Sequence, residues 1–213
     1  MITFNVCTTT QVEDPRKWDP KDIHVSPCGY GYVRAHVRKG ITAMIEEMLL
    51  DSRKAIRTEQ KTEKDPARWA MLEVYQIEMK TAANALYGQF GAPTSPLCSM
   101  SCAYSITADG AHNIKGLAKN LLENEDFAKY GLSIDYGDTD SVMVRAGLVT
   151  TLEEAHAAGN AIARWINVES GMLTGRMKIE FEDVSNPFLL LHKKKYIKCI
   201  ADPNNPSDRT LKI

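Results

Sequence analysis

The clearest pattern in the chain is a series of apolar residues at helical spacing between Lys39 and Lys61. They recur at i, i+3, i+4, i+7 and i+8, which defines one face of a helix. The residues that form this pattern are Ile41, Met44, Ile45, Met48 and Leu49. The pattern therefore predicts a long helix with one apolar face.

A second helix is predicted to follow almost directly. Asp65 has the features of an N-cap residue, and Pro66 is suited to the first helical position. The glycines expected to end this helix are Gly88 and Gly91. Apolar positions continue along it to about Tyr87, at Met71, Val74, Tyr75 and Leu86. Because only a short polar link separates the two helices, we expect them to pack as an antiparallel hairpin.

Two further helices are predicted in the second half of the chain. One covers residues 103–124, with apolar positions that include Ile114 and Leu117. The other begins after Thr151, where Thr151 and Glu154 match a capping box, and runs to about residue 170.

Strand patterns occupy much of the rest of the chain. Residues 132–144 contain apolar residues that alternate on both sides of a turn at 137–140, which predicts a β-hairpin. Further strands are expected at 177–182 and 188–200, and prolines keep residues 1–38 in extended and loop segments. This order of helices and strands indicates the α+β class.

Composition narrows the class of protein. The 213 residues include 26 Lys and Arg and 27 Asp and Glu, so the formal net charge is −1, and 44% of them are hydrophobic. Such a chain can bury a sizeable core, and it is too apolar and too balanced in charge to be disordered. We expect no membrane partner, because every apolar run is far shorter than the roughly 20 residues that cross a bilayer. A secretory signal is not expected either. The charge balance argues against a histone-like basic protein, although it allows local basic patches.

The cysteines and histidines do not suggest a metal site. The cysteines form no CxxC pair, and the histidines have no metal-ligand spacing. We therefore expect free thiols in a reducing compartment, and histidines at the surface or in packing roles.

Two carboxylates, Asp138 and Asp140, lie two residues apart at the predicted hairpin tip. Neighbouring carboxylates repel each other, so leaving both ionised normally requires a cation, and oxygen ligands favour Mg²⁺ or Mn²⁺. Magnesium held by one or two carboxylates and by substrate phosphates is the usual arrangement in phosphoryl transfer. Asp and Gly are also common in turns. The two aspartates alone therefore leave a metal site and ordinary turn chemistry both open.

Three longer motifs identify a family. Residues 136–141, Tyr-Gly-Asp-Thr-Asp-Ser, resemble the YGDTDS motif of family B DNA polymerases, which include delta-type, archaeal and many viral replicative enzymes. Residues 80–88 resemble the family's Kx₃NSxYG element on the fingers, with Ala85 in place of Ser. Residues 193–196 resemble the KKRY element near the primer terminus, with Lys195 in place of Arg. The motifs occur in the family's order, so the resemblance covers nearly the whole chain.

The resemblance implies a division of the chain into three parts. Residues 39–91 would form the antiparallel helical fingers hairpin, and residues 92–213 a palm portion with the catalytic β-hairpin and the Lys-Lys-Lys-Tyr strand. Residues 1–38 would be a palm-side segment that follows the family's first catalytic motif, DxxSLYPS, of which the chain has no copy.

The reaction that the resemblance implies is DNA-directed DNA synthesis, the nucleotidyltransferase reaction of DNA replication. A primer 3′-hydroxyl would attack the α-phosphate of a dNTP and release pyrophosphate. Two Mg²⁺ ions, or Mn²⁺ in their place, would stabilise the attacking and leaving oxygens. Asp140 would be the principal catalytic metal ligand, and Asp138 a secondary one.

The resemblance also assigns nucleotide-binding roles to the fingers. Arg53 and Lys80, and less firmly Arg57, would bind the triphosphate, with Asn84 on the same helix face as Lys80. Tyr87 would line the pocket of the nascent base pair. Residue counts from the link give an axial offset of about 9 Å between Arg53 and Lys80. Without the motifs, an ordinary solvated face with acidic neighbours would be the favoured explanation for the basic residues of the first helix.

DNA binding is assigned to the third motif and to one glycine. Lys193, Lys194, Lys195 and Tyr196 would hold the primer–template backbone through contacts that do not depend on base sequence. Gly88 would allow close approach of the template. The alternative for the lysines is an edge strand whose charges prevent aggregation.

Because the first aspartate motif, the exonuclease domain and the thumb are missing, we expect an incomplete piece that is inactive alone. Its partners would be primer–template DNA, a dNTP, those missing polymerase parts and, where the parent uses one, a sliding clamp. Glu180 and Asp183 are further candidate carboxylates for the site, but nothing in their spacing requires them to lie there.

Two other interpretations are less favoured. A non-catalytic DNA-binding or scaffold subunit derived from a polymerase would usually lose the hairpin aspartates. A reverse transcriptase usually has two adjacent aspartates, whereas Thr139 intervenes here.

Overall fold

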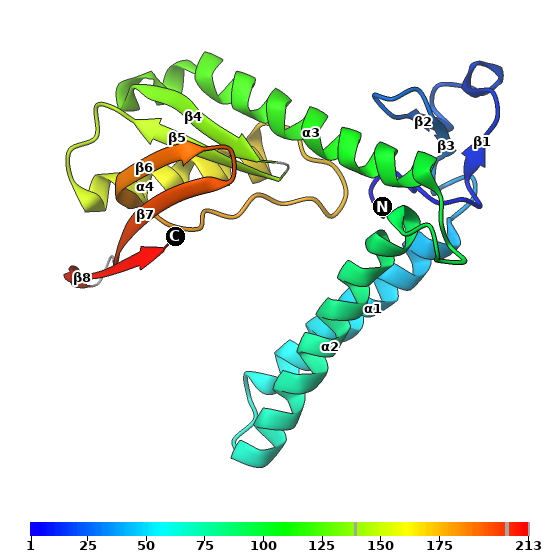
Figure 1. Cartoon of the computed structure of the whole chain (residues 1–213), viewed down its shortest axis with the longest axis horizontal. Helices are drawn as coiled ribbons and strands as arrows, with labels where there is room; N and C mark the ends of the chain where they lie inside the picture. Colours follow the sequence, from blue (N-terminus) through cyan, green and yellow to red (C-terminus); the bar gives the residue numbers. More distant parts are fainter. Residues whose placement is uncertain (139, 203–204, 213) are drawn as a thin grey trace. The chain divides into compact units, whose positions relative to one another are not determined.

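The structure, a computed structural model of the chain, describes residues 1–138, 140–202 and 205–212. It mixes helices and sheets, which confirms the predicted α+β class. The chain forms two compact units, Met1–Asp109 and Gly110–Ile213 (Figure 1).

The first unit begins with a small antiparallel sheet, in a region where only extended segments and loops were predicted. Its strand order is β1-β3-β2, and a short 3₁₀ helix follows the first strand. The strands are β1 (Gln11–Val12), β2 (Ile23–Val25) and β3 (Gly31–Val33).

Asn5 connects this sheet to the start of the first long helix. Its buried amide donates hydrogen bonds to the carbonyls of Val33 (2.6 Å) and Arg38 (2.7 Å) and accepts one from the backbone N–H of Gly40 (2.8 Å). A side chain at Gly40 would not fit, because its Cβ would come 2.7 Å from the Cβ of Cys7. The side-chain amide of Asn5 therefore fixes the position at which the first long helix begins.

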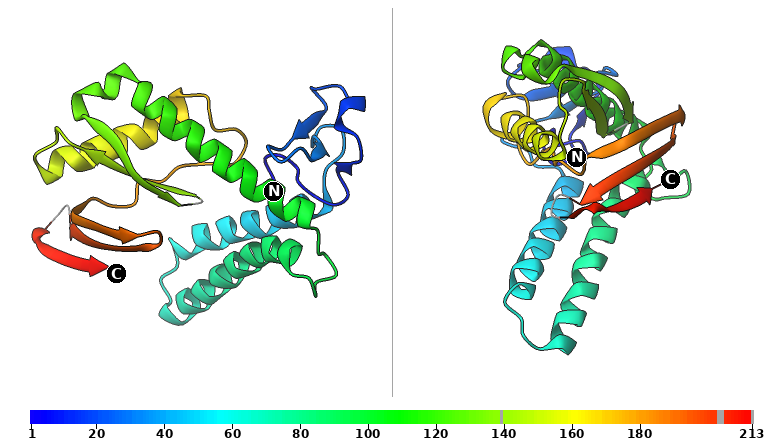
Figure 2. Two further views of the ribbon diagram at one scale, coloured as in Figure 1. Left: turned by 45° about the horizontal axis from the view of Figure 1, so that its top comes forward. Right: turned by 90° about the vertical axis from the view of Figure 1, so that its left-hand side faces the viewer.

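The two long helices form the predicted antiparallel hairpin. Helices α1 (Ile41–Gln60) and α2 (Pro66–Gly91) run side by side in all views (Figures 1 and 2). Asp65 caps α2 by accepting a hydrogen bond from a backbone N–H of its first turn, as predicted. Near the connection, Gln60 Nε2 donates to Glu73 Oε2 at 2.7 Å and joins the two helices.

Helix α2 continues through Gly88 and ends at Gly91, the second of the two glycines predicted to end it. A glycine in a helix costs about 1 kcal/mol. Burial of Phe90, which is fully buried, offsets this with about 2–3 kcal/mol. The core around Phe90 includes Val6 of the N-terminal segment, Tyr32 of β3, and Cys102 and Ala103 of helix α3 (Met100–Glu123).

The apolar stripes predicted for α1 and α2 lie largely on the exposed surface. Met48 is 61% exposed and Val74 is 53% exposed. The buried residues of the two helices are instead Thr42, Ala43, Leu72, Gln76, Ala83 and Phe90. The apolar spacing thus identified the helices correctly but not the faces that they bury within this chain.

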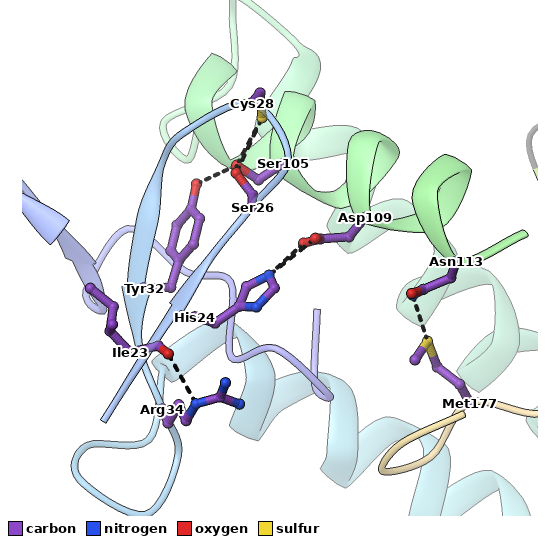
Figure 3. Close-up of polar contacts among 10 residues, drawn as sticks. All are labelled: Ile23, His24, Ser26, Cys28, Tyr32, Arg34, Ser105, Asp109, Asn113 and Met177. Carbon is purple, nitrogen blue, oxygen red and sulfur yellow. Dashed lines mark hydrogen bonds and ion pairs between the residues drawn. The ribbon is translucent and has the colours of Figure 1, made fainter. Parts of the chain in front are cut away.

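Polar contacts join the small sheet to the first part of α3 (Figure 3). His24 Nε2 lies 3.0 Å from both carboxylate oxygens of the buried Asp109, and the His24 ring stacks on Phe4. The hydroxyls of Tyr32 and Ser105 are 2.9 Å apart, and burial raises the pKa of Tyr32. His24 is therefore a packing residue, as expected, with a carboxylate hydrogen-bond partner that the sequence did not indicate.

The second unit contains two antiparallel sheets, the last part of α3, a 3₁₀ helix (Glu125–Tyr130) and further helical segments. A hairpin forms one sheet, and the other has the strand order β6-β7-β8. Its elements are β4 (Leu132–Asp138), β5 (Ser141–Ala146), α4 (Leu152–Arg164), a π-helical turn (Trp165–Glu169), β6 (Ser185–His192), β7 (Lys195–Asp202) and β8 (Asn205–Lys212).

The capping box predicted at the start of α4 is present. The Thr151 hydroxyl accepts a hydrogen bond from the Glu154 backbone N–H at 3.2 Å, and the Glu154 carboxylate accepts one from the Thr151 backbone N–H at 3.4 Å. The π-helical turn extends the helical segment to Glu169, close to its predicted end.

The strand predicted at 177–182 is absent. The side-chain amide of Asn167 takes up both backbone groups of Ile179, with distances of 2.7 Å to its carbonyl and 3.0 Å from its N–H. A side chain thus replaces the neighbouring strand that the pattern of residues implied.

The cysteines are free, as expected. Within the described ranges, no helix combines the length and the apolar character needed to span a membrane.

Candidate active site

The predicted hairpin is present, and it carries the two candidate carboxylates. Asp138 pairs with Ser141, so Asp138 ends β4 while Asp140 lies in the connecting loop. Thr139 falls outside the described residues. The backbone N–H of Asp140 and the hydroxyl of Ser141 both donate to the Asp138 carbonyl, at 2.5 and 3.2 Å. The Asp140 side chain is exposed and has no ion-pair partner among the described residues.

A β-bulge at Asp135 changes the alternation of β4. Ile134 pairs with Val144, whereas Tyr136 pairs with Met143, so Asp135 is an additional residue on this strand. Because Val144 and Met143 are adjacent, they point to opposite faces, and so do Ile134 and Tyr136. In a regular strand without the bulge, Ile134 and Tyr136 would lie on one face. The bulge instead turns Tyr136 to the face that Asp138 shares.

The lysine cluster forms a hairpin turn and not a continuous strand. Strands cover most of the predicted range 188–200, but a turn of Lys193 and Lys194 divides them into β6 and β7. Lys195 and Tyr196 begin β7, and all three lysines are exposed.

The carboxylate hairpin and the lysine turn are in contact. Lys194 Nζ lies 3.3 Å from Asp138 Oδ2, and the Lys194 backbone N–H donates to the Tyr136 hydroxyl at 2.9 Å. The rings of Tyr136 and Tyr196 have centroids 6.2 Å apart. Two motifs that are separated by more than 50 residues in sequence therefore form one site.

Further carboxylates line a cleft of about 1260 Å³ in the second unit, together with Asp140. These include Glu180, which is exposed, and Asp183. The Asp183 carboxylate lies 2.8 Å from Lys198 Nζ, and both side chains are more than four-fifths buried. Asp183 is thus neutralised by Lys198. No group of three or more His, Cys, Asp or Glu within 1–138, 140–202 and 205–212 is arranged to hold a metal ion.

The candidate triphosphate-binding residues lie along the helical hairpin of the first unit. Arg53 Nε donates to Oε1 of the buried Gln76 at 3.1 Å. Lys80 follows Gln76 by one turn, so it lies about 6 Å along the axis from the Arg53 guanidinium, nearer than the 9 Å expected. Asn84 continues the same face. Arg57 is one turn from Arg53 in the opposite direction, and its position supports the triphosphate role least.

Tyr87 and Gly88 lie near the end of α2. The Tyr87 hydroxyl is 2.9 Å from Thr107 Oγ1 of α3, while 42% of the residue stays exposed. A Cβ at Gly88 would meet no atom within 4 Å, so the surface there is open. Ala85, the departure from the family motif, is also exposed.

Three residues that contact candidate site residues were not predicted from the sequence. They are Gln76, the partner of Arg53; Thr107, the partner of Tyr87; and Lys198, the partner of Asp183. Gln76 precedes Lys80 by four residues, so helical spacing alone could have placed it on the same face. Thr107 and Lys198 have no comparable local signal, because they reach their partners only through the tertiary fold.

Comparison with known proteins identifies the family. The model of DNA polymerase family B matches residues 1–212, and the chain therefore belongs to the family B DNA polymerases. It is 37% identical over 204 residues to the DNA polymerase delta catalytic subunit of Glycine max, and 38% identical over 204 residues to that of Bos taurus. Each match covers 92% of this chain and 18% of the relative's length.

A solved structure is similar in fold. The family B DNA polymerase from the hyperthermophilic archaeon Pyrobaculum calidifontis superimposes with a TM-score of 0.69. The match covers 99% of this chain and 25% of that polymerase, at 21% sequence identity.

Proposed function

We propose that these residues are part of a DNA-directed DNA polymerase that adds a dNTP to a primer 3′-hydroxyl in template-directed synthesis. The main support is the contact between the Asp138 hairpin and the Lys194 turn, in a chain that belongs to family B. It brings carboxylates suited to a metal ion next to cations suited to a DNA backbone. In this proposal, 39–91 are the fingers, while 1–38 and 92–213 are palm segments.

Asp140 is the principal candidate for a metal ligand, and Asp138 the secondary one. The exposed Asp140 carboxylate offers the oxygen ligands that Mg²⁺ and Mn²⁺ prefer, whereas the Asp138 carboxylate is already paired with Lys194. Because no larger ligand group occurs among the described residues, the remaining ligands would come from substrate phosphates or other polymerase segments. When bound, two such ions would stabilise the attacking and leaving oxygens of an in-line displacement.

The helical hairpin would bind the incoming nucleotide. Arg53 and Lys80 would neutralise the triphosphate, and Asn84 would add a polar contact on the same face. Arg57 would contribute less, because it lies about two turns, or 12 Å, from the level of Lys80. Tyr87 would line the base-pair pocket, held in place by its hydrogen bond to α3.

The β6–β7 turn would hold the primer–template backbone. Lys193 and Lys195 are exposed, and neither has an ion-pair partner among the described residues. Tyr196 would support the turn through its packing against Tyr136. At the end of α2, the open surface around Gly88 would allow the template to approach the backbone closely.

The test is primer extension with Mg²⁺, by the chain alone and by a chimera. In the chimera, these residues replace the matching segment of a delta catalytic subunit. We expect no extension by the chain alone and extension by the chimera. In the chimera, Asp140→Asn should lower the rate by at least about 100-fold, the scale of losing one transition-state electrostatic contact.

The matched control is Asp135→Asn, which makes the same chemical change on the same hairpin. Asp135 is paired with Arg145 at 2.8 Å, away from the tip. A folded chimera without extension would contradict the proposed function. An Asp140→Asn chimera as fast as the Asp135→Asn control would contradict the metal assignment, and extension by the chain alone would contradict the expected inactivity.

A further inference from the structure

Among the described residues, the segment 171–178 pairs with no strand, and side chains of α3 contact it instead. Asn120 Nδ2 donates a hydrogen bond to Met172 Sδ at 3.0 Å, and Asn113 Nδ2 donates one to Met177 Sδ at 3.6 Å. Figure 3 shows the second of these contacts. The two asparagines are seven residues apart, so they lie on one face of α3, about 10 Å apart along its axis. Two methionine side chains therefore attach this segment to the helix.

Met172 also has support on its other sides. A Cβ at Gly116, which lies on the same helix face, would be 3.5 Å from Met172 Cε, so the methyl group packs over the glycine. The Met172 backbone N–H donates to Ser170 Oγ at 3.2 Å, and that hydroxyl donates to the Ile166 carbonyl at 2.8 Å. Backbone and side chain of Met172 are thus both held, and the sulfur lies beside the amide of Asn120.

The Met172 sulfur is a poor partner for this amide, because a thioether is a weak hydrogen-bond acceptor. It also borders an open hollow of about 400 Å³, lined mostly by polar residues, which are Asn120, Glu123, Asn124, Trp165, Ser170 and Met172 itself. The Glu123 carboxylate is paired with Lys119 at 3.8 Å. Because even a water molecule needs only about 10–15 Å³, the hollow can admit a small polar oxidant and accommodate one added oxygen.

We propose that Met172 is a methionine oxidation site and that Asn120 binds the sulfoxide that forms. The oxidant is a peroxide, here hydrogen peroxide. A lone pair of Sδ attacks one peroxide oxygen, and the S–O bond forms as the O–O bond breaks. The proton of the transferred oxygen passes to the leaving oxygen, which departs as water, so sulfur loses two electrons and the peroxide gains them. The proposal does not depend on the function proposed above.

The expected effect of oxidation at Met172 is the reverse of the usual one. A sulfoxide generally loosens the packing around a methionine, because a flexible apolar side chain becomes polar. At this position the new oxygen gains a donor in Asn120 and occupies a polar hollow. Oxidation should therefore hold the segment 171–178 more firmly to α3. That segment leads directly to Glu180, which lines the cleft together with Asp140.

The test is treatment of the chain with hydrogen peroxide, followed by peptide mass spectrometry and amide hydrogen exchange. Met172 should be converted to the sulfoxide under conditions that convert Met48, which is 61% exposed and serves as the reference. Exchange at the Ser170 N–H, which donates to the Trp165 carbonyl at 2.9 Å, should then slow by about two- to fivefold, the scale of one added hydrogen bond. The proposal is overturned by Met172 that stays unoxidised when Met48 is fully converted, or by exchange that is unchanged or faster after oxidation.

Three variants separate this site from general effects of peroxide. In Asn120→Leu, which removes the donor at an exposed position, oxidation should speed exchange at Ser170. Asn113→Leu makes the matched change on the same helix face, and oxidation should slow its exchange as in the unaltered chain. In Met172→Leu, peroxide should leave the rate unchanged.

Slowing in Asn120→Leu equal to that in the unaltered chain would show that Asn120 does not bind the sulfoxide, and equal slowing in Met172→Leu would show that the effect arises elsewhere. Either result would overturn the proposal. If circular dichroism shows that Asn120→Leu does not fold, the comparison with Met172→Leu decides the proposal on its own.

Discussion

Gly159 of α4 has a steric role that can be tested directly. A Cβ at this position would come 2.6 Å from Cδ2 and Cζ of the Phe181 ring, so the ring would have to move. Phe181 belongs to the segment that carries Glu180 and Asp183 along the cleft shared with Asp140. Gly159→Ala should therefore disturb this segment as well as the helix.

Two opposing effects set the change in the free energy of unfolding that we expect for Gly159→Ala. Replacing glycine by alanine within a helix stabilises it by about 1 kcal/mol. Forcing a methyl group into a filled site costs about 1–3 kcal/mol. The net change for Gly159→Ala should therefore lie between about zero and 2 kcal/mol of destabilisation.

Gly116→Ala on α3 is the matched control in the same unit. The nearest atom to its added Cβ would be Met172 Cε at 3.5 Å, an ordinary contact. Gly116→Ala should therefore be stabilised by about 1 kcal/mol through its higher helix propensity. The free energies of unfolding of the two variants should differ by about 1–3 kcal/mol. Thermal unfolding followed by circular dichroism should resolve this difference, since 1 kcal/mol shifts Tm by about 2–4 °C at this chain length.

Removing the Phe181 ring provides a second test of the clash at Gly159. In a Phe181→Ala background, Gly159→Ala should become stabilising, and the coupling between the two changes should account for most of the clash. If Gly159→Ala raises Tm as much as Gly116→Ala does, the Phe181 ring yields freely and the steric argument is wrong.

The remaining predictions concern stability. Asn5→Ala should lower the free energy of unfolding by at least about 3 kcal/mol in a urea titration, because three buried backbone groups lose their partner; a loss below 1 kcal/mol would contradict this. Tyr32→Phe should cost about 1 kcal/mol in the same titration. Thr151→Ala should cost about 1 kcal/mol by removing the cap of α4. The Thr150 backbone N–H and the Thr151 hydroxyl hold the pKa of Glu154 below its ordinary 4.5. The folded state therefore loses stability as pH falls below that value, and Glu154→Gln should remove this part of the pH dependence in acid titrations of Tm.

Features that depend on neighbouring residues were determined by the sequence. Asp65 and Pro66 start α2, and Thr151 and Glu154 start α4, because a cap involves only residues within one turn. The β4–β5 hairpin follows from two short alternating segments that flank a turn. The three motifs also indicated the family from the residues alone.

Features that depend on distant residues were decided by the tertiary structure. The buried faces of α1 and α2 differ from their apolar stripes, because burial depends on what each helix packs against. The predicted strand at 177–182 is lost, because Asn167 takes up both backbone groups of Ile179.

The candidate site shows the same division. The sequence located Asp138, Asp140 and the lysine cluster, each within a few neighbouring residues. It could not show that a bulge at Asp135 turns Tyr136 and Asp138 toward Lys194, or that Lys194 differs from the lysines on either side of it. Those features arise from strand register and from contacts between residues more than 50 positions apart, where no local pattern constrains the partner.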